Sequence, residues 1–274
     1  MTEQAQALID KFQVKPGEQA RLQDRDARDK SLFGDEQATK AATSALAKDI
    51  DALQDRLYAE GSRALLVILQ GTDTSGKDGT IRSVFNATGP LGVSVHAFGP
   101  PTKLELEHDY LWRVHAACPR RGTIGIFNRS HYEDVLIGKV RKFAPKEAIE
   151  QRYDQINAFE RMLSENGTTI LKFMLHISKD EQKERLQARL DDPTKNWKFN
   201  PGDLDDREHW DDYQEAYETM LSRCSTAWAP WHVIPADRKW VRNAAIGNIV
   251  KATLEAMDPQ YPEVSWKPGD FRVV

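Results

Sequence analysis

Residues 64–80 read ALLVILQGTDTSGKDGT, and this stretch decides the fold. Its first six residues, 64–69, are apolar without interruption, which is typical of a strand buried on both faces of a parallel sheet. Gly71, Gly76 and Lys77 follow with the spacing of a phosphate-binding P-loop. Small residues let backbone N–H groups surround an anion, and Lys77 adds a positive charge. The stretch therefore predicts a strand, a phosphate-binding loop and a helix in that order.

The loop departs from the common P-loop pattern at one position. Asp78 stands where the motif has a Ser or Thr that binds Mg²⁺, and Thr80 lies two positions later. Asp73 lies inside the loop, where a carboxylate would repel phosphate unless a cation lay between them. Asp73 is therefore predicted to be a Mg²⁺ ligand. The alternative, a glycine-rich turn without a ligand, does not explain a lysine between two glycines after a buried strand.

Composition limits the class of protein. With 274 residues and a net charge of −4, the chain has no global bias toward nucleic acid or anionic membranes, so a polyanion site must be a local patch. Its two cysteines, Cys118 and Cys224, form no motif and indicate a reducing compartment. The N-terminus lacks the pattern of a signal peptide, and no apolar run approaches the ~20 residues that span a bilayer. We expect a cytoplasmic protein that binds neither nucleic acid nor membrane.

Strands and helices are expected to alternate along the chain. Apolar runs predict five strands, at 64–69, 93–98, 123–127, 168–177 and 231–235. Helical periodicity is found at 39–60, 81–85, 106–117, 149–165 and 239–257. Residues 1 to about 40 are polar and are expected to form an N-terminal extension whose charged run 21–30 wraps the surface. The alternation predicts a single α/β domain over residues 1–274, with a doubly wound parallel sheet that binds ligands beyond the C-terminal ends of its strands.

A second polar cluster, residues 128–134, follows the third predicted strand. P-loop enzymes usually have a metal-binding Asp at this point, but here Asn128 can only order metal-bound water without adding charge. Arg129 could reach a transferring phosphoryl group. Glu133 and Asp134 could supplement the metal site, although ordinary acids at a helix N-terminus explain them almost as well.

The charged segment 179–215 is helical in character, is broken at Pro193 and Pro201, and is predicted to be a lid. It contains the basic residues Lys183, Arg185, Arg189, Lys195 and Lys198, interleaved with Trp197 and Phe199. Arg185 and Arg189 lie four apart and so share a helix face. A solvated helix is an equal alternative, because acidic residues alternate with the basic ones. Single-stranded nucleic acid fits poorly with the acidic run 203–206 and the net charge.

Taken together, these motifs resemble the polyphosphate kinase 2 family. The matching pieces run in chain order: 65–82, 119–135, 195–198 with Asp203, 210–213 and 229–243. The loop of this family reads G-x-D-x-x-G-K-D/x-G, so Asp73 and Asp78 are expected in it. Many members carry Asp where this chain has Asn128, and the variant resembles the subgroup that phosphorylates both AMP and ADP.

The resemblance implies a P-loop kinase-like three-layer α/β/α fold with a helical lid. It implies reversible transfer of the terminal phosphoryl group of inorganic polyphosphate to AMP or ADP, with GMP and GDP as further candidate acceptors and ATP as a product. It also implies Mg²⁺ as cofactor, with Mn²⁺ as the alternative ion, and assembly as a homodimer or homotetramer. Carried over by position, Asp73 holds the metal, Lys77 binds phosphate, and Arg129 with Arg185 clamps the transferring group. The predicted phosphate- and nucleotide-binding residues are Gly71, Thr74, Ser75, Gly76, Lys77, Asp78, Gly79, Thr80, Arg82, Asn128, Arg129, Glu133, Arg189, Lys195 and Lys198.

The chemistry of the residues is consistent with this reaction. The acceptor oxygen of a nucleotide phosphate is already ionised near neutral pH, so catalysis needs alignment and charge neutralisation and no general base. A chain donor also needs a basic track, for which the candidates are Arg82, Arg113, Arg120, Arg121, Lys139 and Arg141. An ATP-dependent nucleotide kinase of ordinary P-loop type shares nearly all of these parts and is the main rival. A GTPase switch is disfavoured, because the chain has no Asn-Lys-x-Asp motif.

Overall fold

A parallel sheet forms the centre of the computed structural model, which describes residues 2–270, 272 and 273. Within this part of the chain, five strands pair in the order β2-β3-β1-β4-β5. They are β1 Ala64–Gln70, β2 Val93–Ala97, β3 Ile124–Asn128, β4 Thr168–His176 and β5 Trp231–Pro235. The five predicted strands and their parallel arrangement are confirmed, with shifts of a single residue at the ends.

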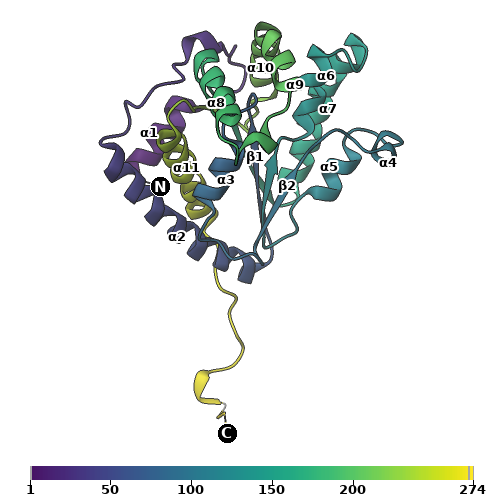
Figure 1. Cartoon of the computed structure of the whole chain (residues 1–274). Coiled ribbons are helices and arrows are strands. Elements are labelled where there is room, and N and C mark those ends of the chain that lie inside the picture. The colour runs from purple at the N-terminus through teal and green to yellow at the C-terminus, as the bar shows by residue number, and fades with distance from the viewer. Residues whose placement is uncertain (1, 271, 274) are drawn as a thin grey trace.

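Helices cover both faces of the sheet (Figure 1). One layer contains α1 Glu3–Phe12, α2 Glu36–Glu60, α3 Lys77–Val84 and α11 Lys239–Met257. The other contains α5 Trp112–Ala117, α7 Lys146–Glu165 and α10 Trp210–Cys224. Successive residues of the fully buried β1 point to opposite faces, so Leu65 and Val67 pack in the first layer and Leu66 and Ile68 in the second. The predicted three-layer α/β/α architecture is confirmed.

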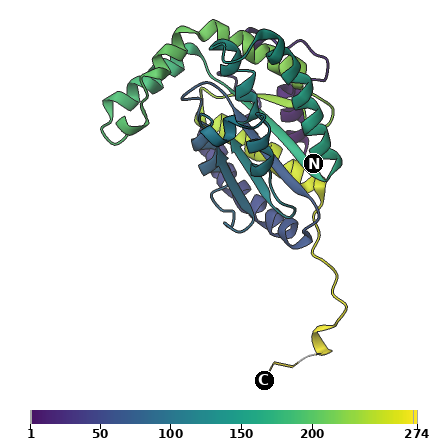
Figure 2. The same cartoon turned by 90° about the vertical axis from the view of Figure 1, so that its right-hand side faces the viewer.

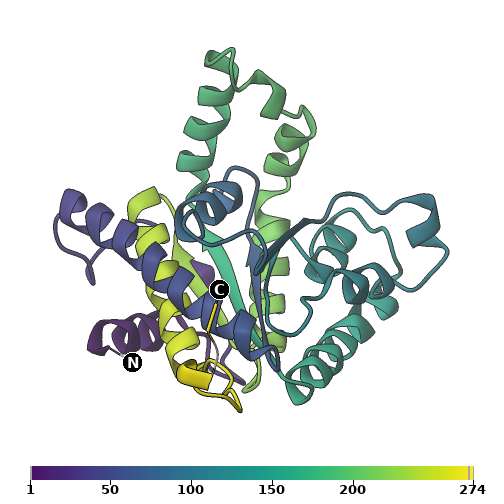
Figure 3. The ribbon, with the colours of Figure 1, turned by 90° about the horizontal axis from the view of Figure 1, so that it is seen from below.

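A lid projects from the body next to the C-terminal edge of the sheet. It consists of α8 Lys179–Asp191, the 3₁₀ turn η3 Asn196–Lys198 and α9 Gly202–Glu208, which extend away from the sheet (Figures 2 and 3). The helices are interrupted between α8 and α9, as the prolines predict. The shorter elements are η1 Leu22–Asp24, α4 Lys103–Leu106, η2 His131–Asp134, α6 Ile137–Val140 and η4 Pro268–Asp270. None of the described helices is long and apolar enough to cross a membrane.

The prediction of one continuous helix over residues 106–117 is wrong. The chain instead forms α4 and α5, separated by residues 107–111. Thr102 and Glu105 begin α4 with a capping box. The side chain of Asp109 accepts a hydrogen bond from the backbone N–H of Leu111 at 2.9 Å. Such local side-chain bonds compete with helix formation and explain the break.

The N-terminal segment is part of the core, which its polar composition did not predict. Leu8 and Phe12 of α1 are buried, α1 packs against α11 and β5, and the N–H of Val14 donates to the carbonyl of Trp231 in β5 at 2.8 Å. Leu22 and Ala27 are also buried, although they lie in the charged run that was expected to wrap the surface. The predicted surface extension is therefore wrong for these positions, because a few apolar side chains in each turn were enough to anchor the segment.

Leu8→Ala should lower the free energy of unfolding by about 2–5 kcal/mol, because it leaves a cavity at a fully buried site. Equilibrium unfolding in urea measures the change. Gln4→Ala, at an exposed position of the same helix, is the matched control and should change the free energy of unfolding by less than about 0.5 kcal/mol. Equal midpoints for the two variants would show that α1 does not contribute to the core.

Candidate active site

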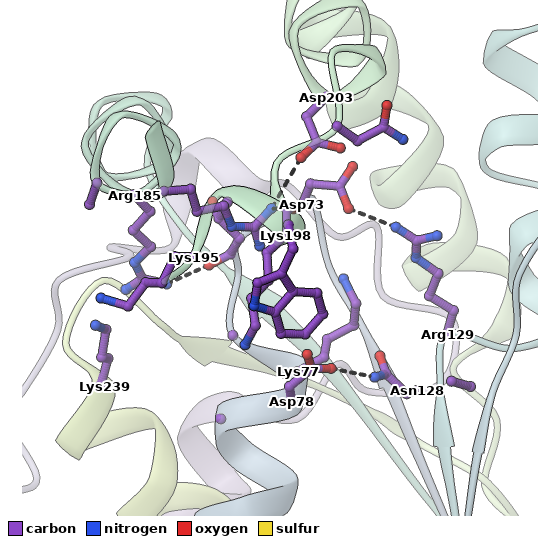
Figure 4. Close-up of a pocket in the computed structure, with 18 of the residues that line it drawn as sticks. Asp73, Lys77, Asp78, Asn128, Arg129, Arg185, Lys195, Lys198, Asp203 and Lys239 are labelled. Carbon is purple, nitrogen blue, oxygen red and sulfur yellow. Dashed lines mark hydrogen bonds and ion pairs between the residues drawn. The ribbon is translucent and has the colours of Figure 1, made fainter. Parts of the chain in front are cut away.

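Two strand ends meet at the C-terminal edge of the sheet. Residues 71–76 connect β1 to α3, and Arg129 follows β3, the neighbour of β1 in the sheet. Leu69 pairs with Asn128, and the N–H of Arg129 donates to the carbonyl of Leu69 at 3.0 Å. The predicted phosphate loop and the second polar cluster therefore lie side by side (Figure 4).

The loop has a backbone that strongly favours glycine at one position. Gly76, the residue before α3, has a φ of 104°, in the left-handed region. A Cβ atom added there would lie 1.7 Å from Nη1 of Arg242. Thr74 also has a positive φ, 63°, which is uncommon for a residue other than glycine. The loop is therefore held in a costly shape by its surroundings, as is frequent at functional sites.

Two arginines hold the carbonyl side of the loop. Arg185 of α8 donates to the carbonyls of Thr74 at 2.9 Å and Ser75 at 3.2 Å. Arg242 of α11 donates to the same Ser75 carbonyl at 3.0 Å. The C=O and the following N–H of a planar trans peptide point in opposite directions, so the N–H of Gly76 faces away from both guanidinium groups. Together with the first N–H groups of α3, which have no partner within a helix, it forms an anion-binding nest.

The N–H groups of Arg185 do not point into the site as the predicted clamp on the transferring group would require. Its Nε donates to Glu181 at 2.7 Å, and its Nη2 donates to the carbonyls of Ala236 and Asp237 at 2.7 and 2.8 Å. With the two bonds from Nη1 to the loop, each of its five N–H groups is engaged by described residues. This arrangement leaves no donor for a transferring phosphoryl group, so Arg185 connects the lid to the loop.

The side chain of Lys77 is buried against the backbone carbonyls of the loop. Its Nζ donates to the carbonyls of Gly71 at 2.7 Å and Thr72 at 3.3 Å. Burial and the nearby charge of Arg129 lower the pKa of Lys77 to about 8. The ammonium group is thus poorly compensated within the protein, and a phosphate in the nest would provide the missing negative charge.

Asp73 and Arg129 face each other across the site. Nη2 of Arg129 donates to Oδ1 of Asp73 at 2.7 Å, and Arg129 has a φ of 63°. Burial lowers the pKa of Arg129, but the charges of Glu133 and Asp73 outweigh it and raise the value. Glu133, which is partly buried, has a raised pKa mainly because of burial. Arg129 is therefore fully charged and is held between two acids.

Asn128 contacts the first turn of α3. Its Nδ2 donates to Oδ1 of Asp78 at 2.6 Å. An amide suits this position, because an Asp here would place two carboxylates in contact. The variant residue noted in the sequence thus has a direct partner in the first turn of α3.

A cavity of about 640 Å³ opens above the loop, between the strand ends and the lid. Two residues of α11 in its lining, Arg242 and Lys239, were not predicted. Lys239 is labelled in Figure 4. The basic lining residues are Lys77, Arg129, Arg185, Arg189, Lys195, Lys198, Lys239 and Arg242, and the acidic ones are Asp73, Asp78 and Asp203. The cavity is therefore strongly cationic, although the whole chain carries a net charge of −4.

The lid contributes part of this lining through its own ion pairs. Nη1 of Arg189 donates to the carbonyl of Lys198 at 2.9 Å and to Asp203 at 3.1 Å. Lys195 pairs with Asp192 at 2.6 Å. The exposed Trp197 lies beside Nζ of Lys198, 5.0 Å from the ring centroid. These local contacts stabilise the conformation of the lid, which places both basic and acidic side chains in the lining of the cavity.

Most predicted binding residues lie at this cavity. Thr74, Gly76, Lys77, Asp78, Gly79, Asn128, Arg129, Arg189, Lys195 and Lys198 line it, and Gly71 and Glu133 line a smaller adjoining cavity of about 70 Å³ with Asp73 and Arg129. Ser75 and Thr80 are fully buried in the loop and first turn. Arg82 is exposed on α3 and lines neither cavity.

The residues suggested for a basic track are not part of the main cavity. Lys139 pairs with Glu215 and Arg141 with Asp206. Arg113 donates to the carbonyl of Gly99, and Arg120 lies over the ring of Tyr58. The basic residues that do line the cavity come from the lid and α11. None of the suggested residues lines this cavity, so their place on a track that extends beyond the loop stays a prediction.

The acidic side chains at the cavity fit a hard divalent cation bound jointly with phosphate. Burial and the charge of Asp73 raise the pKa of Asp203 to about 6, so the two carboxylates repel each other. A cation near Asp73 would relieve this repulsion. No group of three or more His, Cys, Asp or Glu side chains in the described chain is placed to hold a metal, so such an ion would complete its shell with phosphate oxygens and water, as Mg²⁺ commonly does.

Fold and site together define a P-loop phosphotransferase. The chain belongs to the polyphosphate kinase 2 family, whose sequence profile matches residues 34–262. It is 52% identical over 254 residues to the AMP/ADP-polyphosphate phosphotransferase of Meiothermus ruber, covering 92% of this chain and 95% of the relative. It is 44% identical over 225 residues to the ADP-polyphosphate phosphotransferase of Rhodopseudomonas palustris, covering 78% of each.

A solved structure gives the same result for the fold. The crystal structure of polyphosphate kinase 2 from Arthrobacter aurescens superposes with a TM-score of 0.92 at 41% identity. The match covers 96% of this chain and 94% of the other. The resemblance noted in the sequence is therefore confirmed at the level of family and fold.

Asp203→Asn should stabilise the protein above pH 6 and should do so by a smaller amount at pH 4.5. The native state keeps the proton of Asp203 up to about pH 6, whereas the unfolded chain releases it near its ordinary value of 3.8. Between these values the native state binds more protons, so stability falls as pH rises. Asn mimics the neutral acid and removes this loss. Thermal unfolding at pH 4.5 and 8 tests it, with exposed Asp205→Asn as control; equal shifts for both variants at pH 8 would contradict it.

Proposed function

We propose that the protein transfers the terminal phosphoryl group of inorganic polyphosphate to AMP or ADP, in a reversible reaction that requires Mg²⁺. The observation that carries the proposal is the cationic cavity above a P-loop, with eight basic and three acidic side chains in its lining. A phosphate chain carries about one charge per phosphate and needs such an environment well beyond a single loop. The relatives from Meiothermus and Rhodopseudomonas, both named as polyphosphate phosphotransferases, support it.

The loop and two cations position the reacting phosphates. The nest of N–H groups at Gly76 and the start of α3 binds phosphate oxygens, and Lys77 moves from the loop carbonyls to the phosphate. Arg129 neutralises charge on the transferring group once the ligand competes for its bond with Asp73. Arg185 contributes indirectly, because its hydrogen bonds to the loop carbonyls keep the loop in the conformation that binds phosphate. Each contribution is one of alignment and electrostatics, as phosphoryl transfer requires.

Asp73 is the residue that would hold Mg²⁺. Asp203 of the lid is close enough for its charge to interact with that of Asp73. An ion held by Asp73 would neutralise charge on the phosphates, and Mn²⁺ has the same ligand preference. No proton needs to be removed, because the acceptor is an ionised phosphate oxygen. The absence of a nucleophile or base from the proposed set of residues is consistent with this chemistry.

The donor distinguishes this proposal from an ordinary ATP-dependent nucleotide kinase. With ADP as acceptor, long-chain polyphosphate should support rapid ATP formation, and with AMP it should give ADP and then ATP. The product is measured by chromatography of the nucleotides. Formation of product from AMP with a nucleoside triphosphate as donor, but none with polyphosphate, would establish the rival reaction.

Lys77→Ala and Asp73→Ala should each lower kcat by about 100- to 1,000-fold while the protein stays folded, because each removes charge that stabilises the transition state. Initial rates with polyphosphate and ADP measure the loss, and circular dichroism checks the fold. Lys40→Ala, an exposed lysine of α2, is the matched control and should retain full activity. Near wild-type turnover in either of the first two variants would reject the assignment of that residue.

A further inference from the structure

A buried group of charged and polar side chains lies between β4, α7 and the turn that follows Arg129. Nζ of Lys172 donates to Oε2 of Glu160 at 2.6 Å, to Oη of Tyr132 at 2.7 Å and to the carbonyl of Cys224 at 2.7 Å. Tyr132 Oη donates to the other oxygen of Glu160 at 2.8 Å, and Nε2 of His131 lies 3.2 Å from the same atom. We call Lys172, Glu160, Tyr132 and His131 the Lys172 network.

The network is fully buried, which is unusual for a charged pair. Lys172, Glu160 and Tyr132 have no exposed surface, and His131 is 1% exposed. Burial raises the pKa of Glu160, but Lys172 and His131 outweigh it and lower the value, so the carboxyl is ionised. Apolar residues of similar size often give equal or greater stability than a buried ion pair. Stability alone is therefore a weak explanation for these charges.

The network holds the segment that carries Arg129. Tyr132 and His131 belong to η2, which begins two residues after Arg129, and Ser130 caps the turn by accepting the N–H of Tyr132 at 3.2 Å. Arg129 has a φ of 63°, so its backbone needs support from its neighbours to keep this conformation. Glu133, the residue after Tyr132, influences Arg129 electrostatically. The orientation of Arg129 toward Asp73 thus depends on where η2 lies.

We propose that Lys172 and Glu160 are positioning residues for phosphoryl transfer, acting through Tyr132 to hold residues 130–134 so that Arg129 faces the phosphate loop. They do not contact substrate, because they lie in the core beneath the turn. The inference rests on the proposed function, since Arg129 is the residue through which they act. It predicts that breaking the network reduces kcat and leaves substrate binding at the loop largely intact.

Tyr132→Phe and Tyr153→Phe are a matched pair that tests this inference. Both tyrosines are fully buried in the same core. Among the described residues, the hydroxyl of Tyr153 has no hydrogen-bond partner, whereas that of Tyr132 joins η2 to the network. Tyr132→Phe should lower kcat at least fivefold with KM changed by less than twofold. Tyr153→Phe should leave both within twofold. A kcat within twofold of wild type for folded Tyr132→Phe would overturn the inference.

A second variant separates positioning from stability. Lys172→Met with Glu160→Met removes both charges together and leaves neither one unpaired, so it should fold even where a single replacement does not. We expect its kcat to fall at least fivefold while its Tm stays within a few degrees of wild type. Wild-type kcat in this double variant would show that the charges serve only the core.

A double-mutant cycle tests whether the network acts through Arg129. In an Arg129→Lys background, Tyr132→Phe should lower kcat by less than twofold, because the group that it positions is already altered. Full additivity of the two effects would overturn the inference.

Hydrogen exchange provides a readout that needs no turnover. Amides in residues 128–136 should exchange faster in Tyr132→Phe than in Tyr153→Phe, and equal exchange would overturn the inference whatever the substrates are. Faster exchange in a protein that does not use polyphosphate would instead support the network and reject the proposed function.

Discussion

The carbonyl oxygen of Ser75 accepts hydrogen bonds from two arginines, and the shape of the proposed phosphate site depends on this contact. Arg185 reaches it from the lid and Arg242 from the last long helix. Because the peptide is planar, fixing the carbonyl also fixes the N–H of Gly76 on the opposite side. The contact explains why position 76 has no room for a Cβ atom and why Thr74 keeps an unfavourable φ. The anion-binding nest is thus a product of long-range contacts as much as of the loop sequence.

The protein handles buried positive charge in two different ways. Lys172 has Glu160 as a close partner, so its charge is neutralised within the core. Arg242 has no carboxylate partner among the described residues, and burial together with the charge of Arg185 lowers its pKa to about 9. The charge of Lys172 is therefore balanced without a ligand. The charge of Arg242 is not balanced by a carboxylate of the described chain, so the cavity that it lines keeps excess positive charge, which favours binding of a polyanion.

Local patterns were enough to predict most of the fold. The apolar runs of β1 and β4 and the glycine spacing of the loop are signals within a few residues, and the structure confirms the elements that they predict. Arg242 was missed because the periodicity of residues 239–257 indicates an amphipathic helix but does not show which of its polar side chains reaches the loop. The sequence placed Arg185 on the lid but could not show that its donors point backward to the loop. The burial of α1 was missed because it depends on distant partners in α11 and β5.

Arg242 stands 167 residues after Ser75 in the chain, and Ala236 and Asp237, which also bind Arg185, are nearly as far away. During synthesis on the ribosome, the loop therefore emerges long before the groups that shape it. A nascent chain that ends before β5 contains the whole glycine-rich motif but lacks the contacts that orient its peptide groups. The shape of the proposed phosphate site is thus acquired late in translation, when β5 joins the sheet and α11 packs against it.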